Sequence, residues 1–245
     1  MTLQSRRQNE KGNILFLILL AVILFAALSY AVTQSLRGGG TDASSEKNLV
    51  KSAQITQYPV GVRAAILRMI VGGTDVTTLN FDPPSTFGDG SWGSTAAKSL
   101  ALNVFHPTGG GAVFSLVPSE ALATASSTQR WVFTMNYGVP NIGTTASTST
   151  NAGKDLMAIA PNIDATLCAK IDAQLGVAAV PTLSSTGVSV AVAASTMQEV
   201  VEYTYAPVYS ANLTDGSTGL NDKPYLCVKN GSNTDYFYYH VLVER

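Results

Sequence analysis

A run of uncharged, mostly apolar residues near the start of the chain constrains its fold more than any other feature. The run covers residues 14–32, and Ser29 and Tyr30 are its only polar members. As a helix it would be roughly 28 Å long, about the thickness of the hydrocarbon core of a bilayer. The chain therefore contains a segment that can cross a membrane.

Basic residues precede this run. Arg6, Arg7 and Lys11 lie before it, and the first charge after it is Arg37. Because basic residues are retained on the cytoplasmic side of a membrane, this asymmetry predicts a cytoplasmic N-terminus. The rest of the chain is then expected outside the cytoplasm.

Three interpretations of the run are open. The first is a cleavable secretion signal, with Ser29-Tyr30-Ala31 as its small-x-small cleavage site. The second is a plain membrane anchor. The third is a helix retained on the mature protein, behind a short basic leader that ends at Gly12 and is cut before Asn13. The apolar stretch is long for a cleavable signal, which favours a retained helix.

The stretch RRQNEKGNILFLILLAVILFAALSYAVTQS resembles the N-terminus of type IV pilins and pseudopilins, in a divergent form associated with pilin-like proteins of Alphaproteobacteria. The segments LNVFHPTGGGAVF and NIDATLCAKIDAQLG are similar to the same group, most of which lack an assigned function. In this resemblance Gly12 is the glycine before the processing site and Asn13 is the first mature residue. Two positions depart from the family: Asn13 replaces the usual Phe or Met, and Leu17 replaces a Glu that is thought to aid docking of an incoming subunit.

The resemblance implies a structural subunit of a type IV pilus-like or secretion pseudopilus-like assembly. Its implied partners are the membrane, a prepilin peptidase, and copies of itself or other pilin-like subunits. It also implies a single pass through the inner membrane, with a periplasmic or extracellular globular part. The alternative is a monomeric membrane-tethered envelope domain that binds a protein or glycan partner. An enzyme is the third interpretation, and we expect none.

The implied fold is α+β, with an N-terminal transmembrane helix followed by a helix packed on a mostly antiparallel sheet. The predicted parts are a leader (1–12), a transmembrane helix (13–36), a linker with a juxtamembrane helix (37–73) and an exported globular domain (74–245). Glycines at residues 38–40 predict a break or a helix end, because three helical glycines cost about 3 kcal/mol relative to alanine. Pro59 predicts a kink or a split in the second helix.

Short strands separated by turn residues are predicted after residue 73. They cover residues 76–81, 100–105, 112–117, 131–136 and 155–160. HPTGGG predicts a turn that joins the second and third of these in a hairpin. The low-complexity patch at residues 143–153 predicts a mobile loop.

A short helix and a C-terminal hairpin are predicted next. The apolar residues of the helix recur every fourth position, at Ile163, Leu167, Ile171 and Leu175. Asn162 or Asp164 can cap its start, and Gly176 falls where a helix ends in a left-handed residue. In the last strand, alternation predicts a buried face of Phe237, Tyr239, Val241 and Val243, and outward Tyr236, Tyr238 and His240.

Two cysteines, Cys168 and Cys227, lie far apart in the sequence. A disulfide is the better interpretation if the domain lies outside the cytoplasm, and two separate buried thiols are the alternative. The bond would close a loop of about 60 residues and stabilise the fold by roughly 4 kcal/mol. Pilins commonly carry a disulfide near the C-terminus, so the resemblance supports the pairing.

The composition excludes a nucleic-acid partner and points to export. The 15 basic and 16 acidic residues give a net charge of -1, which attracts no polyanion. Only 13% of the residues are charged, against about 25% in typical domains. Ser, Thr, Gly, Ala and Asn take the surface places of Lys and Glu, which indicates an exported domain.

No pattern predicts a catalytic, cofactor-binding or metal-binding residue. Gly88, Gly90 and Gly93 match G-x-G-x-x-G by letter but lack a surrounding strand–helix unit, so a loop is predicted. His106 and His240 lie in no nucleophile or metal motif and are predicted to be surface or hydrogen-bonded residues. The aspartates of three polar loops lack EF-hand spacing and are predicted to be solvated turn residues; they are Asp215, Asp222 and Asp235.

Overall fold

A computed structural model describes two compact units, Met1–Lys47 and Asn48–Arg245. The described residues are 10–84, 99–126, 129–135, 137–144, 153–183, 213, 220–231 and 235–245. Within helix α1 the described side chains are those of residues 14–34 and of residue 46 onward. The predicted loops around Gly88 and Asp215 and most of the predicted loop at 143–153 lie outside the described residues.

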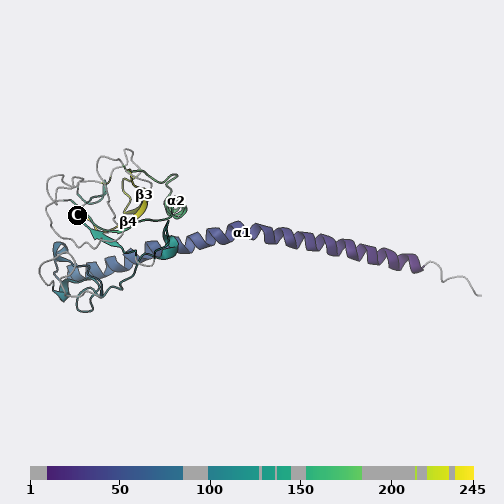
Figure 1. The fold of residues 1–245 in the computed structure, drawn as a ribbon, viewed down its shortest axis with the longest axis horizontal. Helices are drawn as coiled ribbons and strands as arrows, with labels where there is room; N and C mark the ends of the chain where they lie inside the picture. The colour runs from purple at the N-terminus through teal and green to yellow at the C-terminus, as the bar shows by residue number, and fades with distance from the viewer. Residues whose placement is uncertain are drawn as a thin grey trace, which may run out of the picture. The chain divides into compact units, whose positions relative to one another are not determined.

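Helix α1 spans Glu10–Val71 and includes residues 38–40 and Pro59 (Figure 1). The predicted break at the glycines is therefore wrong, and the helix is not split at Pro59. Glycine lowers helix propensity by about 1 kcal/mol per residue without a steric block, so favourable neighbours can carry a helix through it. Pro59 lies in the buried part of the helix, where apolar packing offsets its cost of about 3 kcal/mol.

The part of α1 in the Asn48–Arg245 unit carries one buried stripe. Ile55, Val62, Ile66 and Met69 are at most 8% exposed and follow one another at intervals of seven, four and three residues. This spacing places them on one helix face. They pack into a core with one face of the β-sheet and with helix α2, Ala165–Gln174.

The sheet has four antiparallel strands in the order β1-β2-β4-β3. The strands are β1 (Val132–Thr134), β2 (Leu156–Ala160), β3 (Tyr225–Lys229) and β4 (Tyr236–Val243). The predicted strands at 131–136 and 155–160 and the predicted C-terminal hairpin are confirmed, the first in shortened form. The architecture is α+β.

Two of the earlier predicted strands are wrong. Residues 76–81 begin with the 3₁₀ helix η1, Val76–Thr78, which Asp75 caps by accepting a hydrogen bond from the N–H of Thr77. Residues 100–105 begin with η3, Leu100–Leu102, and only a single bridge joins Asn80 to Asn103. In both segments, local turns satisfy backbone groups that a ladder would otherwise pair.

Residues 112–117 belong to no described strand, so the strand predicted there is wrong, and η4, Ser119–Ala121, follows them. The predicted turn before them is present, because the N–H of Ala112 donates to the carbonyl of Val104. A Cβ atom at Gly109 would overlap the carbonyl oxygen of Asn103, which explains a glycine there. The turn therefore reverses the chain without forming the predicted two-stranded hairpin.

Both faces of the sheet are buried, and this overturns part of the prediction for β4. Tyr238 is fully buried on the face that α1 covers, whereas Phe237, Tyr239 and Val241 belong to a second core on the opposite face. A shift in the β2–β4 register places both Leu242 and Val243 with the first core. Such a bulge re-aims the residues that follow it, so Val243 does not share the face of Val241.

Candidate functional site

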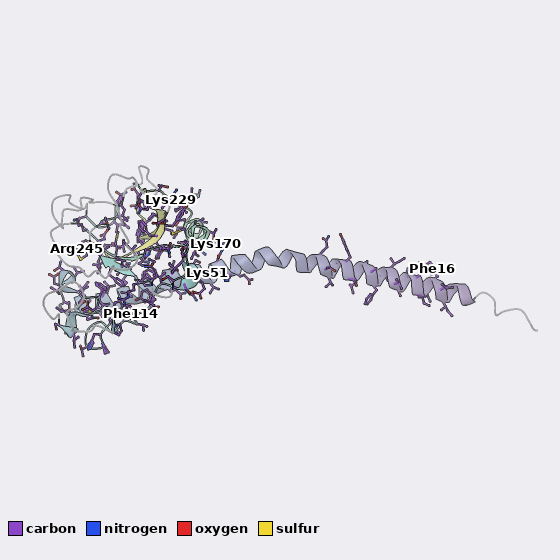
Figure 2. The ribbon with its side chains drawn as sticks, viewed as in Figure 1. Phe16, Lys51, Phe114, Lys170, Lys229 and Arg245 are labelled. Atoms are coloured by element: carbon purple, nitrogen blue, oxygen red, sulfur yellow. A yellow bond between two sulfur atoms is a disulfide. The ribbon has the colours of Figure 1, made fainter. Side chains whose placement is uncertain are left out.

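The segment Ile14–Gln34 of α1 is the first candidate, and by length and composition its 21 residues are able to cross a membrane. All of its side chains are exposed, and Figure 2 shows them, Phe16 included, projecting from the helix with no cover. A signal sequence near the N-terminus has the same properties. The segment is therefore either a membrane span or a signal.

The polar residues of this segment are hydrogen-bonded within the helix. The Ser29 hydroxyl donates to the carbonyl of Phe25 at 2.8 Å, and the Thr33 hydroxyl donates to the carbonyl of Ser29. The Gln34 amide donates to the Tyr30 hydroxyl at 2.8 Å. Because hydrocarbon offers no hydrogen-bonding partner, this pairing lowers the cost of placing the segment in lipid.

The predicted processing site lies in the first turn of the same helix. Gly12 and Asn13 are helical in backbone, and the Asn13 side chain lies outside the described set. Leu17 is 56% exposed and provides no carboxylate at this point of the helix.

The Asn48–Arg245 unit contains a disulfide between Cys168 of α2 and Cys227 of β3. Their Cα atoms are 5.2 Å apart, and both residues are fully buried. Asp164 caps α2 by accepting from the N–H groups of Thr166 and Leu167, and Gly176 follows the helix at a φ of 75°. The predicted helix, cap and left-handed terminus are all confirmed, and together they hold Cys168 against the sheet.

Asp172 lies one turn after Cys168, also fully buried. Its Oδ1 accepts from the N–H of Cys227 at 2.9 Å, and its Oδ2 has no hydrogen-bond partner in the described part of the chain. Burial raises the pKa of Asp172 to about 7, and the hydrogen bond from Cys227 opposes this shift. Sequence analysis missed this residue, although its four-residue spacing from Cys168 already places both on one helix face.

His240 is buried at 5% exposure, so its predicted outward position is wrong. Its Nδ1 lies 2.9 Å from the Tyr238 hydroxyl, and its ring stacks on Tyr225 with centroids 5.2 Å apart. Burial lowers the pKa of His240 to about 4, and the nearby positive charge of Arg63 adds to this effect. His240 is thus a neutral, hydrogen-bonded core residue at neutral pH.

An open groove of about 720 Å³ lies between α1 and residues 111–118, which lead into η4. The Tyr58 hydroxyl accepts from the N–H of Ser115 at 3.3 Å, and the Tyr58 ring lies 5.0 Å from that of Trp131. Burial raises the pKa of Tyr58 to about 12, against the opposing effect of the Ser115 hydrogen bond. Gln54 and Gln57 add exposed amides to the rim, so the groove has both apolar and polar surface.

The remaining predicted sites show no chemical cluster. His106 lies in the glycine turn, where its Nδ1 is 2.7 Å from the Thr108 hydroxyl, so it is a hydrogen-bonded histidine as predicted. Asp222 is an exposed turn residue at a φ of 61°. Among the residues that the structure describes, no three His, Cys, Asp or Glu side chains are grouped to hold a metal ion.

We compared the chain with known protein families, proteins and structures. No protein-family model, no curated protein and no solved structure matches the chain. The residues of the chain itself are therefore the basis for its proposed function.

Proposed function

We propose that this chain is a structural subunit of a type IV pilus-like or secretion pseudopilus-like assembly, anchored by its N-terminal helix. The observation that carries this proposal is the apolar segment Ile14–Gln34, whose side chains are all exposed within the described chain. Apolar surface of this extent needs lipid or another protein to remove it from water. A retained helix that is inserted in the membrane and packed against copies of itself meets that need.

Three further features support the proposal. The basic leader ends in Gly12, the residue that precedes the processing site in the prepilins that the chain resembles. The domain after the apolar segment packs the second part of α1 on an antiparallel sheet. The disulfide between Cys168 and Cys227 ties its C-terminal hairpin to α2.

The same proposal includes a single pass through the inner membrane, with the N-terminus in the cytoplasm. Arg6, Arg7 and Lys11 precede the apolar segment, which supports this orientation. The disulfide supports a domain in the periplasm or outside the cell, because such bonds persist in oxidising compartments.

The mature N-terminus tests the processing step. The full chain is expressed in a bacterium that has a prepilin peptidase, and its N-terminal residue is determined by mass spectrometry. A mature chain that begins at Asn13 supports the proposal, and Gly12→Val should block the cut. A chain that begins at Val32 indicates a secretion signal, and an intact Met1 leaves an anchor only.

Crosslinking in the membrane tests assembly. Leu20→Cys places a thiol in the apolar segment, and both native cysteines are already bonded to each other. We expect oxidation to give disulfide-linked dimers of this variant. Val60→Cys, on an exposed face of α1, is the matched control for random collision. Monomer alone from Leu20→Cys contradicts packing of the helix against copies of itself.

The second candidate is a monomeric membrane-tethered envelope domain that binds a protein or glycan. Two observations favour it: Leu17 provides no acid for subunit docking, and the groove beside Tyr58 offers both aromatic and amide groups. Processing without any crosslinked product would support this candidate over the assembly subunit.

A further inference from the structure

The groove beside Tyr58 has one wall made by a single face of α1. Four of its lining residues follow one another at intervals of four, three and seven, which places them on one side of the helix: Gln54, Tyr58, Gly61 and Arg68. The helix rises by roughly 21 Å from the first to the last of them. Residues 111–118 form the facing wall. The groove is therefore long enough for a linear oligomer.

Gly61 is the point at which the helix wall is open. It is exposed, and a Cβ atom at this position would meet nothing within 4 Å outside the backbone of its own helix. No close approach of another segment requires a glycine here, although glycine costs about 1 kcal/mol relative to alanine inside a helix. The missing side chain leaves room in the groove between Tyr58 and Arg68.

Two aromatic side chains bring hydrogen-bond donors to the groove. The indole Nε1 of Trp131 is buried and has no hydrogen-bond partner in the described part of the chain. The Tyr58 hydroxyl accepts from the N–H of Ser115, and no described group accepts its own proton. Burial raises the pKa of Tyr58 to about 12, so the hydroxyl keeps that proton at neutral pH. Because an unpaired buried donor costs about 1–3 kcal/mol, these two groups favour a ligand that carries an acceptor.

The charges of the groove favour a neutral ligand. Arg68 and Glu120 are the charged residues among the described lining, and they have opposite signs. Arg68 already donates to the carbonyl of Gly110 at 3.0 Å. A polyanion or a polycation would therefore meet repulsion as well as attraction along the groove.

A peptide bound as an added strand fits residues 111–118 poorly. The N–H of Ser115 donates to the Tyr58 hydroxyl, and the N–H of Val117 donates to the carbonyl of Gln129. Alternate residues of a strand direct their N–H groups to the same side, so the groups that an added strand would need on this side are already bonded. The groove therefore offers side chains, and not a free backbone edge, to a ligand.

The side chains at the rim match sugar hydroxyls. Gln54 and Gln57 are exposed there, and each amide both donates and accepts hydrogen bonds, as a hydroxyl does. An acetamido group adds a carbonyl acceptor for the aromatic donors. Its methyl group suits the apolar surface that Val62 and Leu116 contribute. A sugar that carries an acetamido group thus combines the properties that the groove selects.

We propose that this groove binds a neutral N-acetylated glycan. The sugar rings lie along α1 over Gly61, and their hydroxyls pair with the amides of the rim. An acetamido carbonyl accepts from the Tyr58 hydroxyl and, after a small rotation of the Tyr58 ring, from the indole N–H of Trp131. The site lies within the Asn48–Arg245 unit, so its occupancy does not depend on assembly through residues 14–34.

Isothermal titration calorimetry of the intact chain, in a detergent without a sugar headgroup, tests this site. The probe is chitotetraose, an oligomer of N-acetylglucosamine. Maltotetraose, which has hydroxyls but no acetamido group, is the comparison. We expect chitotetraose to bind with a Kd below about 1 mM and maltotetraose to bind at least about tenfold more weakly.

Two matched variants of α1 locate the site. Gly61→Leu fills the open part of the groove and should weaken chitotetraose binding at least about tenfold, while its higher helix propensity favours the fold. Ala64→Leu is exposed on the same helix but outside the groove lining, so it should bind like the wild type. Should Gly61→Leu fail to fold, Gln57→Ala at the exposed rim replaces it and should also weaken binding.

Three results would overturn the proposal: no binding of chitotetraose, equal binding of both oligomers, or binding that the groove variants leave unchanged. Each is independent of the assembly proposal, because disulfide crosslinking of Leu20→Cys reports contact between copies without any glycan. Failure of glycan binding with intact crosslinking would therefore reject this site alone.

Discussion

The two described stretches of α1 place their apolar side chains in opposite ways. In residues 14–34 apolar side chains occupy every side of the helix and all are exposed. In residues 48–71 one stripe is buried, as at Ile55 and Ile66, and the other sides carry residues such as Gln54 and Gln57. An amphipathic helix packs on a protein core, whereas a helix that is apolar all round requires an apolar medium on all sides. One helix thus contains a segment suited to lipid and a segment suited to packing on a protein core.

This difference separates two measurable properties of the chain. Membrane attachment should depend on residues 14–34 and not on the buried stripe. The free energy of unfolding of the Asn48–Arg245 unit should depend on the stripe, the disulfide and the helix cap. A variant in residues 14–34 that changes the free energy of unfolding, or a variant in the buried stripe that changes membrane attachment, would contradict this separation.

Removal of the disulfide should have the largest effect on unfolding. Replacing both Cys168 and Cys227 by Ser frees a loop whose ends are 59 residues apart. We expect the free energy of unfolding to fall by roughly 4 kcal/mol, measured by urea denaturation in detergent micelles. Membrane fractionation should give the same distribution as for the wild type. Loss of the double variant from the membrane fraction would show that the two properties are coupled.

Truncation of the buried stripe should have the next largest effect. Ile66→Ala removes a fully buried side chain and should lower the free energy of unfolding by about 3 kcal/mol. The adjacent Leu67 is 42% exposed, so Leu67→Ala should change it by at most about 0.5 kcal/mol. Equal effects of the two variants in urea denaturation would contradict the assignment of the buried face.

A charge in the apolar segment should affect attachment alone. Leu24→Arg should make insertion in the membrane about 3 kcal/mol less favourable and reduce the fraction that resists alkaline extraction. Val60→Arg, at a position that is 54% exposed, is the control and should leave this fraction unchanged. Unaltered extraction of Leu24→Arg would argue against a membrane span.

The cap of α2 should have the smallest effect, and one that depends on pH. Asp164→Ala should cost about 1 kcal/mol at neutral pH, because two helix N–H groups lose their acceptor. The hydrogen bond from Thr166 lowers the pKa of Asp164, so the stabilisation exists above the unfolded-state pKa and disappears as the pH falls through the folded-state value. The difference between wild type and Asp164→Ala in urea denaturation should therefore shrink in acid. Asp164→Asn retains an acceptor and should stay close to the wild type at neutral pH.

Sequence periodicity predicted the parts of the fold that are regular. Helix α2, its cap at Asp164 and the strands β2, β3 and β4 follow from spacing and turn residues. The exposed apolar segment follows from hydropathy and length alone. These features are local, so neighbouring residues suffice to specify them.

The errors arise where distant parts of the chain decide the outcome. Alternation along β4 predicts that Tyr238 faces solvent, because Phe237 and Tyr239 point to the opposite, buried face of the sheet. Both faces are in fact buried, and Tyr238 packs in the core that contains α1. Residues 76–81 have β-branched side chains, but Asp75 caps a 3₁₀ turn before a strand can form. The helix periodicity places Asp172 on the face of Cys168, but its hydrogen-bond partner, the N–H of Cys227, comes from β3, which is distant in sequence.

The aromatic contact between Tyr58 and Trp131 provides an optical reporter inside the Asn48–Arg245 unit. Trp131 is 5% exposed, packs on Tyr58 of α1 and lies edge-on to Tyr238 of β4. Its fluorescence will therefore shift to longer wavelength when the second part of α1 leaves the sheet and water reaches the indole. The chain has one other tryptophan, Trp92. In a Trp92→Phe variant all tryptophan emission would come from Trp131, so it would report the separation of α1 from the sheet in real time.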